Sequence, residues 1–377
     1  MNQAVLLAGG GTGGHVFPSL AVAAALRDAR PDLDIGFVGT TRGLESRLVP
    51  EAGWPLFEVG VLPLNRRPSL AALRIPSALL RASSAVAGVL RGRGAVGAAV
   101  FGGYVSLPLA LAAWRTGTPY VVHEQNAIPG LANRIAARRA AAVAVTFPSS
   151  VTRLGRRVPV QVTGNPVRPG LADTGPEGRA AAGALFGLDP QRRTLLVFGG
   201  SQGAQRINAA VAGSLGRWRA PEDLQILHAT GLGRAEQAAS DLAAAAGAAG
   251  SGNTPLVRAV EFIDRMDLAY AAADVVVARS GASTIAELTV LGLPSVLVPY
   301  PHATADHQMA NACDLTAAGA ATVVADADLD GAALVAAAEP LLYDDAVRLE
   351  MAAAARRFGR PDAAARVAAM ILQAAER

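Results

Sequence analysis

The sequence predicts an α/β protein with two Rossmann-like parallel-sheet domains in tandem. Short apolar runs alternate with helical patterns along most of the chain, which is typical of buried parallel strands joined by crossover helices. A strand, a glycine-rich turn and a helix occur together at residues 4–29 and again from residue 194, the opening of a nucleotide-binding βαβ unit. A length of 377 residues also favours two domains.

The apolar runs give the expected strands of each domain. In the first half they are Ala4–Ala8, Ile35–Val38, Leu56–Val59, Val96–Phe101, Tyr120–His123, Ala142–Thr146 and Val158–Thr163. In the second half they are Thr194–Phe198, Gln225–Ala229, Leu256–Val260, Asp274–Ala278, Ser295–Val298 and Ala321–Val324. The linker-like run Gly164–Gly170 predicts domains at residues 1–164 and 165–377, with the last helix packing back on the first domain. Because ligands bind at the carboxyl ends of such strands, we expect the domains to face each other across a cleft.

Composition excludes several classes of site. The single cysteine, Cys313, rules out an intrachain disulfide and a cysteine-built metal site, and it fits a reducing compartment. All 34 basic residues are arginines, so a Walker-type phosphate loop, which needs a lysine, is absent. The uncharged stretch Gly94–Trp114 is long enough to cross a membrane, but its central glycines and proline favour a strand, a turn and a buried helix. The N-terminus lacks the features of a signal peptide, and we expect a soluble protein.

The first glycine loop favours an anion but argues against a dinucleotide. Gly9, Gly11 and Gly14 satisfy G-x-G-x-x-G, and the helix that follows directs free N–H groups at a ligand. A dinucleotide site also needs an acid at the end of the next strand to bind a ribose. That strand ends in Gly39-Thr40-Thr41, so an NAD-dependent oxidoreductase is a disfavoured alternative.

Charge is unevenly distributed along the chain. Residues 59–172 contain 14 arginines and one acid, Glu124, which predicts an acidic partner. Within this region the arginines of Leu64–Arg93 (Arg66, Arg67, Arg74, Arg81, Arg91 and Arg93) are interleaved with apolar residues, as in a helix lying on an anionic membrane surface. The alternative, an amphipathic helix that packs on its own domain, is almost as well supported by the same pattern. Aromatic residues are missing among these arginines, which argues against nucleic acid as the partner.

The second domain contains the more specific motif. The strand Asp274–Ala278 leads into Arg279-Ser280-Gly281 and then a helix containing Glu287. Backbone N–H groups and hydroxyls there suit a diphosphate, and Glu287 is placed to accept hydrogen bonds from a ribose. The structural alternative makes Ser283 a helix cap with Glu287 as its partner. Polar residues also follow other strands, at Tyr104, at His123–Asn126, and at His302, Asp306, His307, Gln308 and Asn311.

Seven motifs in order resemble the MurG family of bacterial N-acetylglucosaminyltransferases. They are Gly-Gly-Thr-Gly-Gly-His, Gly-Gly-Tyr-Val-Ser, His-Glu-Gln-Asn, Gly-Asn-Pro-Val-Arg, Gly-Gly-Ser-Gln-Gly-Ala, Glu-Phe-Ile and Arg-Ser-Gly-Ala-x-Thr-x-x-Glu. The resemblance implies a GT-B fold and inverting transfer of N-acetylglucosamine from UDP-N-acetylglucosamine to the muramyl 4-hydroxyl of lipid I (undecaprenyl-pyrophosphoryl-MurNAc-pentapeptide), forming lipid II. It further implies a peripheral protein at the cytoplasmic face of the cell membrane that needs no cofactor.

The same resemblance implies the substrate contacts. These are Thr12, Gly13, Gly14, Asn126, Arg168, Ser201, Ile263, Ala282, Ser283, Thr284, Ile285, Ala286, Glu287 and Gln308, with His307 as an alternative to Gln308 and with Tyr104 added from its loop position.

The reaction needs a base for the acceptor hydroxyl and stabilisation of the departing diphosphate. His15 is the expected base, with its pKa lowered by the helix N-terminus, and Glu124 is the rival. Helix N-termini and Arg168 can hold the diphosphate, so we expect no metal. The literal Asp-x-Asp at Asp326–Asp328 lies in the segment Ala325–Asp330 before a helix, which is interpreted as a solvated turn and helix cap. Another sugar-nucleotide enzyme, such as an epimerase or a lipid glucosyltransferase, and a non-catalytic basic binding module remain as alternatives.

Overall fold

The computed structural model describes residues 3–60, 75–154, 158–171, 175, 177–200, 203–250 and 252–376. It separates into two compact units. One is formed by Met1–Arg168 together with Arg360–Arg377, and the other by Pro169–Gly359. We call them the first and the second domain and describe each by itself.

The first domain is a parallel sheet in the order β3-β2-β1-β4-β5-β6-β7. Its strands are β1 (Ala4–Ala8), β2 (Asp34–Gly39), β3 (Leu56–Glu58), β4 (Ala95–Val100), β5 (Tyr120–Glu124), β6 (Ala142–Val145) and β7 (Val160–Val162). Its helices are α1 (Gly13–Ala29), α2 (Glu45–Glu51), α3 (Ile75–Gly92), α4 (Ser106–Thr116), α5 (Leu131–Ala136), the 3₁₀ turns η2 (Ala137–Arg139) and η3 (Pro148–Arg153), and α14 (Ala363–Ala375).

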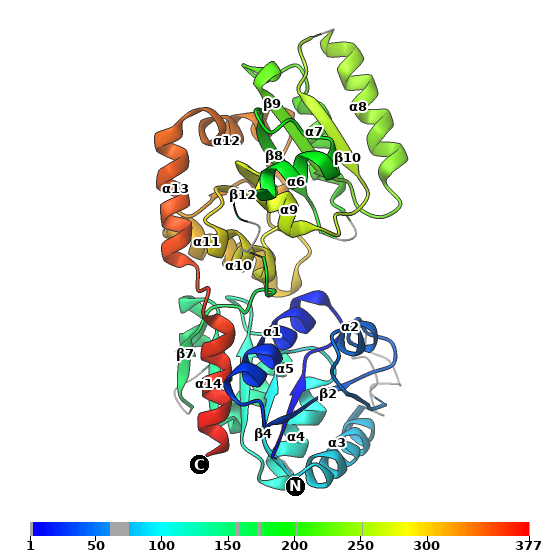
Figure 1. The fold of residues 1–377 in the computed structure, drawn as a ribbon, viewed down its shortest axis with the longest axis vertical. Helices are drawn as coiled ribbons and strands as arrows, with labels where there is room; N and C mark the ends of the chain where they lie inside the picture. The colour runs from blue at the N-terminus through cyan, green and yellow to red at the C-terminus, as the bar shows by residue number, and fades with distance from the viewer. Residues whose placement is uncertain are drawn as a thin grey trace. The chain divides into compact units, whose positions relative to one another are not determined.

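Alternation along the strands divides the core of the first domain into two layers. Leu6 on β1 packs in one apolar cluster with residues of α3, α4 and α5. Its neighbours Val5 and Leu7 pack in the other cluster with α1 and with Ile371 of α14. Figure 1 shows α14, in red, beside α1 of the same domain. The last helix therefore supplies part of the first domain's core.

The second domain repeats this plan in the order β10-β9-β8-β11-β12-β13, again all parallel. Its strands are β8 (Arg193–Phe198), β9 (Leu224–Ala229), β10 (Leu256–Val260), β11 (Val275–Ala278), β12 (Ser295–Leu297) and β13 (Thr322–Val323). Its helices are α6 (Glu177–Phe186), α7 (Gln205–Ser214), α8 (Ala235–Ala249), α9 (Met266–Ala272), α10 (Ala282–Leu291), α11 (His307–Ala317), α12 (Gly331–Tyr343), α13 (Asp345–Phe358), and the 3₁₀ turns η4 (Pro221–Asp223), η5 (Thr304–Asp306) and η6 (Asp326–Asp328).

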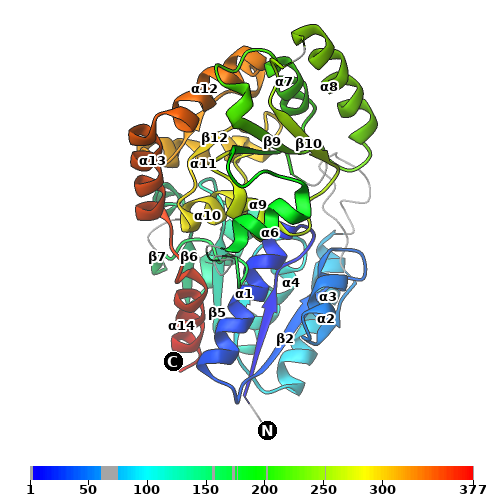
Figure 2. The same ribbon diagram turned by 45° about the horizontal axis from the view of Figure 1, so that its top comes forward.

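Helices again cover the sheet of the second domain. Leu195 and Val197 of β8 pack in one cluster with Ile207 of α7 and Leu334 of α12. The helix α8 lies beyond the sheet edge, against α7 and β10 (Figure 2).

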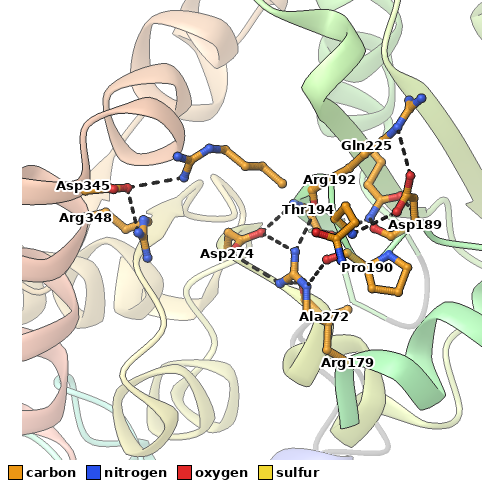
Figure 3. A network of polar contacts seen from close by, with 12 residues as sticks. Arg179, Asp189, Pro190, Arg192, Thr194, Gln225, Ala272, Asp274, Asp345 and Arg348 are labelled. Carbon is orange, nitrogen blue, oxygen red and sulfur yellow. Dashed lines mark hydrogen bonds and ion pairs between the residues drawn. The ribbon is translucent and has the colours of Figure 1, made fainter. Parts of the chain in front are cut away.

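A polar network fixes α6 to the start of the second sheet (Figure 3). The Arg179 guanidinium donates to the Asp274 carboxylate at 3.0 Å and to the backbone carbonyls of Arg192 and Ala272 at 2.7 and 2.9 Å. The same carboxylate accepts the Thr194 N–H at 2.7 Å. The network therefore links α6 to the amino-terminal end of the sheet. Ligands bind at the opposite end in such folds, where the strands have their carboxyl ends.

Both sheets reverse their strand order at one place, between β1 and β4 and between β8 and β11. Ligands of open α/β sheets bind at such switch points, and all four loops that meet there are the glycine-containing motifs of the sequence. The expected strands are confirmed within one or two residues at each end. In the part of the chain that the structure describes, none of the helices combines the length and the apolar character needed to cross a bilayer.

Candidate active site

His15 lies in the first turn of α1, directly after the glycine loop that follows β1. Its Nδ1 lies 3.1 Å from the Gly10 carbonyl oxygen. Since a carbonyl only accepts hydrogen bonds, Nδ1 carries the proton and Nε2 keeps its lone pair. A Cβ at Gly102, the first glycine after Phe101, would lie 2.7 Å from Nε2. That position must therefore be glycine for the imidazole to occupy this place.

The pKa of His15 is lowered, as expected, but the main cause differs from the expected one. Burial lowers this pKa, while the hydrogen bond to the Gly10 carbonyl and the charge of Glu45 raise it. His15 is nevertheless only half-buried as a residue, so part of its surface remains accessible to solvent.

Beneath His15, His123 forms a buried network at the end of β5. Its Nε2 donates to the Gly164 carbonyl at 3.1 Å and its Nδ1 accepts from Gln125 Nε2 at 3.1 Å. Gln125 Nε2 also donates to the Phe101 carbonyl at 2.6 Å. Burial is the main cause that lowers the pKa of His123 to about 4; the hydrogen bond to Gly164 opposes it, and the nearby His15 adds to it. A neutral His123 thus joins the loops after β4 and β5 to Gly164.

Glu124, the rival base, has both carboxylate oxygens occupied. Oε1 accepts the backbone N–H of Asn126 at 2.9 Å, and Oε2 accepts the N–H of Gly130 at 3.0 Å and Asn133 Nδ2 at 2.9 Å. Burial raises the pKa of Glu124, and these hydrogen bonds oppose that effect. The carboxylate therefore holds the loop that carries Asn126 in place.

A cavity of about 470 Å³ adjoins the first glycine loop. Gly10, Gly11, Tyr104 and Glu45 line it, together with the segment 40–43 that follows β2. Tyr104 is half-exposed at its wall. Arg168 lies elsewhere in the domain, with its guanidinium 4.6 Å from the centre of the Phe17 ring on α1.

A larger cavity of about 950 Å³ opens at the switch point of the second sheet. Gly199, Gly200 and Gly203 from the loop after β8 line it, together with residues of α7 and of the segments after β9, β11, β12 and β13. Its charged lining consists of Arg206, Arg234, Arg279 and Asp326. The volume falls within the range of roughly 300–1,000 Å³ typical of small-molecule sites, and the arginine excess suits a diphosphate.

The helix cap expected in Ala325–Asp330 is confirmed, but the solvated setting expected for Asp326 is wrong. Asp326 forms an ion pair with Arg279 at 2.6 Å, with only 16% of its side chain exposed. Arg279 also donates to the carbonyls of Val298 and Pro299 at 3.2 and 3.1 Å. The helix cap is Asp330, whose Oδ1 accepts the Ala333 N–H at 2.8 Å. Asp326 is therefore neither solvated nor a cap, because it serves as the counterion of Arg279.

Glu287 lies on α10 and is 8% exposed. Its Oε2 accepts the Tyr270 hydroxyl at 2.8 Å, and the Tyr270 ring in turn contacts Phe198 edge-on at the end of β8. The proposed capping role of Ser283 is wrong, since Gly281 is the N-cap residue of α10 and no side chain caps the helix.

The structure distributes the predicted site residues between the two domains. Thr12, Gly13, Gly14, His15, Tyr104, Glu124, Asn126 and Arg168 belong to the first domain. In the second domain, Thr284 and Gln308 line the 950 Å³ cavity, Ala282, Ser283, Ile285, Ala286 and Glu287 share α10 with Thr284, and Ile263 is buried after β10. Gln308 Oε1 accepts the Tyr300 N–H at 2.9 Å, whereas His307 Nδ1 donates to the Thr304 carbonyl at 2.8 Å. Ser201 lies outside the described residues.

Sequence reasoning missed several lining residues. Arg279 stands in a quoted motif, but its role beside the cavity needed the fold to become visible. Glu45 was overlooked because the search for an acid after β2 ended at Thr41. Among the described residues, no group of three or more His, Cys, Asp or Glu side chains is placed to hold a metal ion.

Comparison with known proteins identifies the family. Residues 5–145 match the Glycosyltransferase family 28 N-terminal domain, and residues 194–367 match the family's C-terminal domain. A UDP-N-acetylglucosamine--N-acetylmuramyl-(pentapeptide) pyrophosphoryl-undecaprenol N-acetylglucosamine transferase from Nocardioides sp. is 45% identical over 373 residues, 98% of this chain and 97% of that relative. The enzyme of the same name from Mycolicibacterium smegmatis is 45% identical over 98% of this chain and 94% of its own length. The crystal structure of Acinetobacter baumannii MurG matches with a TM-score of 0.78 and 29% identity, over 98% of this chain and 99% of that one.

The chain belongs to the MurG family. Membership in the MurG family confirms the resemblance carried by the seven motifs and makes the chain a glycosyltransferase. The two Rossmann-like sheets are those of the GT-B fold of MurG structures. This membership rules out the two alternatives from other classes, an NAD-dependent oxidoreductase and a binding module without catalysis.

Proposed function

We propose that this protein transfers N-acetylglucosamine from UDP-N-acetylglucosamine to the muramyl 4-hydroxyl of lipid I, with inversion, and so forms lipid II for peptidoglycan synthesis. The reaction is that named for its relatives at 45% identity. The observation that carries the proposal is the arginine-rich cavity at the second switch point, whose size and charge suit a sugar nucleotide. The donor then belongs to the second domain and the base to the first.

In this mechanism the donor diphosphate lies among Arg206, Arg234 and Arg279, where its growing charge is stabilised as UDP departs. Thr284 and Gln308 contribute polar groups to the same cavity. Glu287 accepts hydrogen bonds from the ribose, oriented by the Tyr270 hydroxyl.

His15 removes the proton of the acceptor hydroxyl through Nε2. Support comes from its tautomer, since Nδ1 is engaged by the Gly10 carbonyl, and from its lowered pKa. A neutral imidazole with a free lone pair is the form that a general base requires. Glu124 is less suited, because donors already occupy both of its oxygens.

Transfer proceeds without a metal ion in this proposal. The role that a divalent cation plays in other transferases, neutralising the leaving diphosphate, falls to arginines. The first acid of the Asp-x-Asp sequence, Asp326, is already paired with Arg279. Activity that persists in EDTA and does not change on addition of Mg²⁺ would support this point, and a requirement for Mg²⁺ would contradict it.

The protein acts at the cytoplasmic face of the membrane, where the first domain rests on anionic lipid. On the neighbouring helices α3, α4 and α5, Leu80, Trp114 and Leu131 are exposed. Arg139 lies over the Trp114 ring, 4.2 Å from its centre. Val86 of α3, in contrast, is buried against the domain, so α3 has both a packed face and an exposed one. Arg66, Arg67 and Arg74 lie outside the described residues.

The proposed reaction is tested with purified protein, UDP-N-acetylglucosamine radiolabelled in the sugar, and lipid I in detergent. We expect label to pass into a lipid product and UDP to be released in equal amount, only when acceptor is present. UDP release without acceptor-dependent product, or formation of the 2-epimer of the donor, would replace the proposal with another sugar-nucleotide activity.

The base is tested by the pH dependence of kcat for His15→Ala and Glu124→Gln at saturating substrates. We expect loss of His15 to lower kcat by roughly 10²–10⁴ and to abolish the acidic limb. Glu124→Gln should keep that limb, since its carboxylate holds a loop. If His15→Ala retained the limb and Glu124→Gln lost it, the role of base would pass to Glu124.

A further inference from the structure

Glu45, the first residue of α2, places its carboxylate beneath the glycine loop that carries His15. Oε2 accepts the backbone N–H of Gly11 at 2.8 Å. Oε1 accepts the N–H of Thr40 at 3.2 Å and its hydroxyl at 2.8 Å. One carboxylate thus joins the loop after β1 to the segment after β2.

The surroundings of Glu45 are shaped to hold this carboxylate. The residue is 1% exposed, and three glycines leave room for its side chain. A Cβ at Gly10 would lie 2.9 Å from its carboxyl carbon, and one at Gly39 would lie 2.8 Å from its Cγ. At Gly43 an added Cβ would collide with the carboxylate itself. A buried acid with three donors in a space kept open by glycines is a built feature and not a surface charge.

Glu45 and His15 hold the two ends of the same peptide unit. Glu45 accepts the N–H of Gly11, and His15 Nδ1 donates to the carbonyl of Gly10. These two groups belong to the single planar peptide bond between Gly10 and Gly11. Its plane cannot rotate without breaking one bond or the other, so the carboxylate fixes the carbonyl that in turn fixes the imidazole. Hydrogen bonds in such a chain also polarise one another.

We infer that Glu45 is a positioning residue for catalysis, which holds His15 in its reactive tautomer and orientation through the Gly10–Gly11 peptide unit. The inference rests on the proposed role of His15 as the base. Glu45 is not a catalytic residue, since its oxygens are used by the protein's own donors. Glu45 also accepts the N–H of Gly11. In a dinucleotide-binding domain, N–H groups of this loop bind the ligand.

Glu45 acts on His15 through its negative charge as well as through its hydrogen bonds. The titratable group that acts on the pKa of His15 from a packed element is Glu45 on α2, and His15 itself acts on the pKa of His123 on β5. The loops after β1 and β4 present the backbone of Gly10 and Gly102. Glu45 raises the pKa of His15. Removing this negative charge therefore lowers the pKa of His15 further and moves the acidic limb of kcat to lower pH.

The test compares Glu45→Gln with Glu51→Gln. Glutamine has nearly the shape of glutamate, but its NH₂ group turns a donor toward either Gly11 or Thr40, which are donors themselves. Glu51 lies at the end of the same helix and is exposed, in an ion pair with Arg47 at 3.6 Å. Its change removes the same charge from α2 without touching the loop. The measurements are kcat against pH, the KM for donor, and the NMR titration of the His15 imidazole.

For Glu45→Gln we expect kcat to fall by about 10–100-fold, as small misplacements of catalytic groups do, with donor KM changed less than about twofold. We also expect His15 to titrate at lower pH than in the wild type. Glu51→Gln should match the wild type in all three. A folded Glu45→Gln protein with wild-type kcat and wild-type His15 titration would overturn the inference, as would an equal effect of Glu51→Gln.

A second variant, Gly43→Ala, keeps the charge and displaces the carboxylate. Gly43 has no positive φ, so alanine fits its backbone, and the atoms nearest to the added methyl are those of the Glu45 carboxylate. We expect a fall in kcat comparable with that of Glu45→Gln, and unchanged activity would overturn the inference even if Glu45→Gln failed to fold. The NMR titration does not depend on turnover. A wild-type protein without transferase activity would thus refute the proposed function, while the effect of Glu45 on His15 would still be measured.

Discussion

The buried His228 makes the stability of the second domain depend on pH. It lies on β9, fully buried, and its Nε2 donates to Asn208 Oδ1 at 3.0 Å. Asn208 in turn donates to the Thr230 carbonyl at 3.0 Å. The other ring nitrogen, Nδ1, has no hydrogen-bond partner within the described residues. Protonation would therefore place a charge and an unpaired N–H in the interior, and burial lowers the pKa of His228 from 6.5 to about 4.

The sign and size of the effect follow from this pKa. Between pH 6.5 and about 4 the unfolded chain binds a proton at this histidine and the native domain does not, so the native state loses stability as pH falls. The stability that the lowered pKa of His228 contributes is fully present above pH 6.5. At about 1.4 kcal/mol for each pH unit, the loss reaches roughly 3 kcal/mol by pH 4.

The variant His228→Gln can still donate to Asn208 but does not titrate. Between pH 7 and pH 4 we expect the free energy of unfolding to fall less in this variant than in the wild type. The difference between the two falls should be roughly 3 kcal/mol. Urea unfolding followed by pulse-labelling hydrogen exchange of the β9 peptides measures this domain separately. His302→Gln, at an exposed histidine of the same domain, is the control. Equal pH dependence in His228→Gln and wild type would refute the reasoning.

Three further predictions concern the site. Glu287→Ala should weaken donor binding by about 1.5–3 kcal/mol, the range for hydrogen bonds to charged groups, and Tyr270→Phe should weaken it less; calorimetry showing unchanged affinity would contradict the ribose assignment. Gly102→Ala should lower kcat at least about 10-fold with donor binding intact, because its Cβ would lie 2.7 Å from His15 Nε2; normal kcat in that variant would contradict the geometry. Flotation with vesicles should require anionic lipid, weaken with salt and weaken further in Arg81→Glu, whereas equal binding to neutral vesicles at high salt would argue against an anionic docking surface.

Local patterns were sufficient for the strands. β1 has the predicted bounds, because a parallel strand buried on both faces reads as a continuous apolar run between turn residues. The edge strand β10 also has the predicted bounds. The same pattern predicted the glycine loops after β1 and β8, whereas the strand order that makes them switch points came from the structure. Of the residues that the family resemblance implied as substrate contacts, Thr284 and Gln308 line the larger cavity.

Long-range pairing could not be read in this way. Asp326 seemed to belong to a solvated turn, but its partner Arg279 lies on another loop of the sheet. Glu45 bonds to Gly11, which lies 34 residues earlier in the chain. The lowered pKa of His15 was expected from its helix position, whereas burial, a property of the whole domain, is the main cause. Each of these features depends on contacts between segments that the sequence separates.

The packing of α14 on β4, β5 and α1 affects how the protein must be made. Residues 1–168 emerge from the ribosome first, but Val367 and Ile371 of their core belong to the last helix. Domains generally fold as units during synthesis. Here the second domain can reach its native state first, while the sheet that precedes it keeps an uncovered apolar face until α14 has been translated. A truncation before α14 would therefore damage the domain at the opposite end of the sequence.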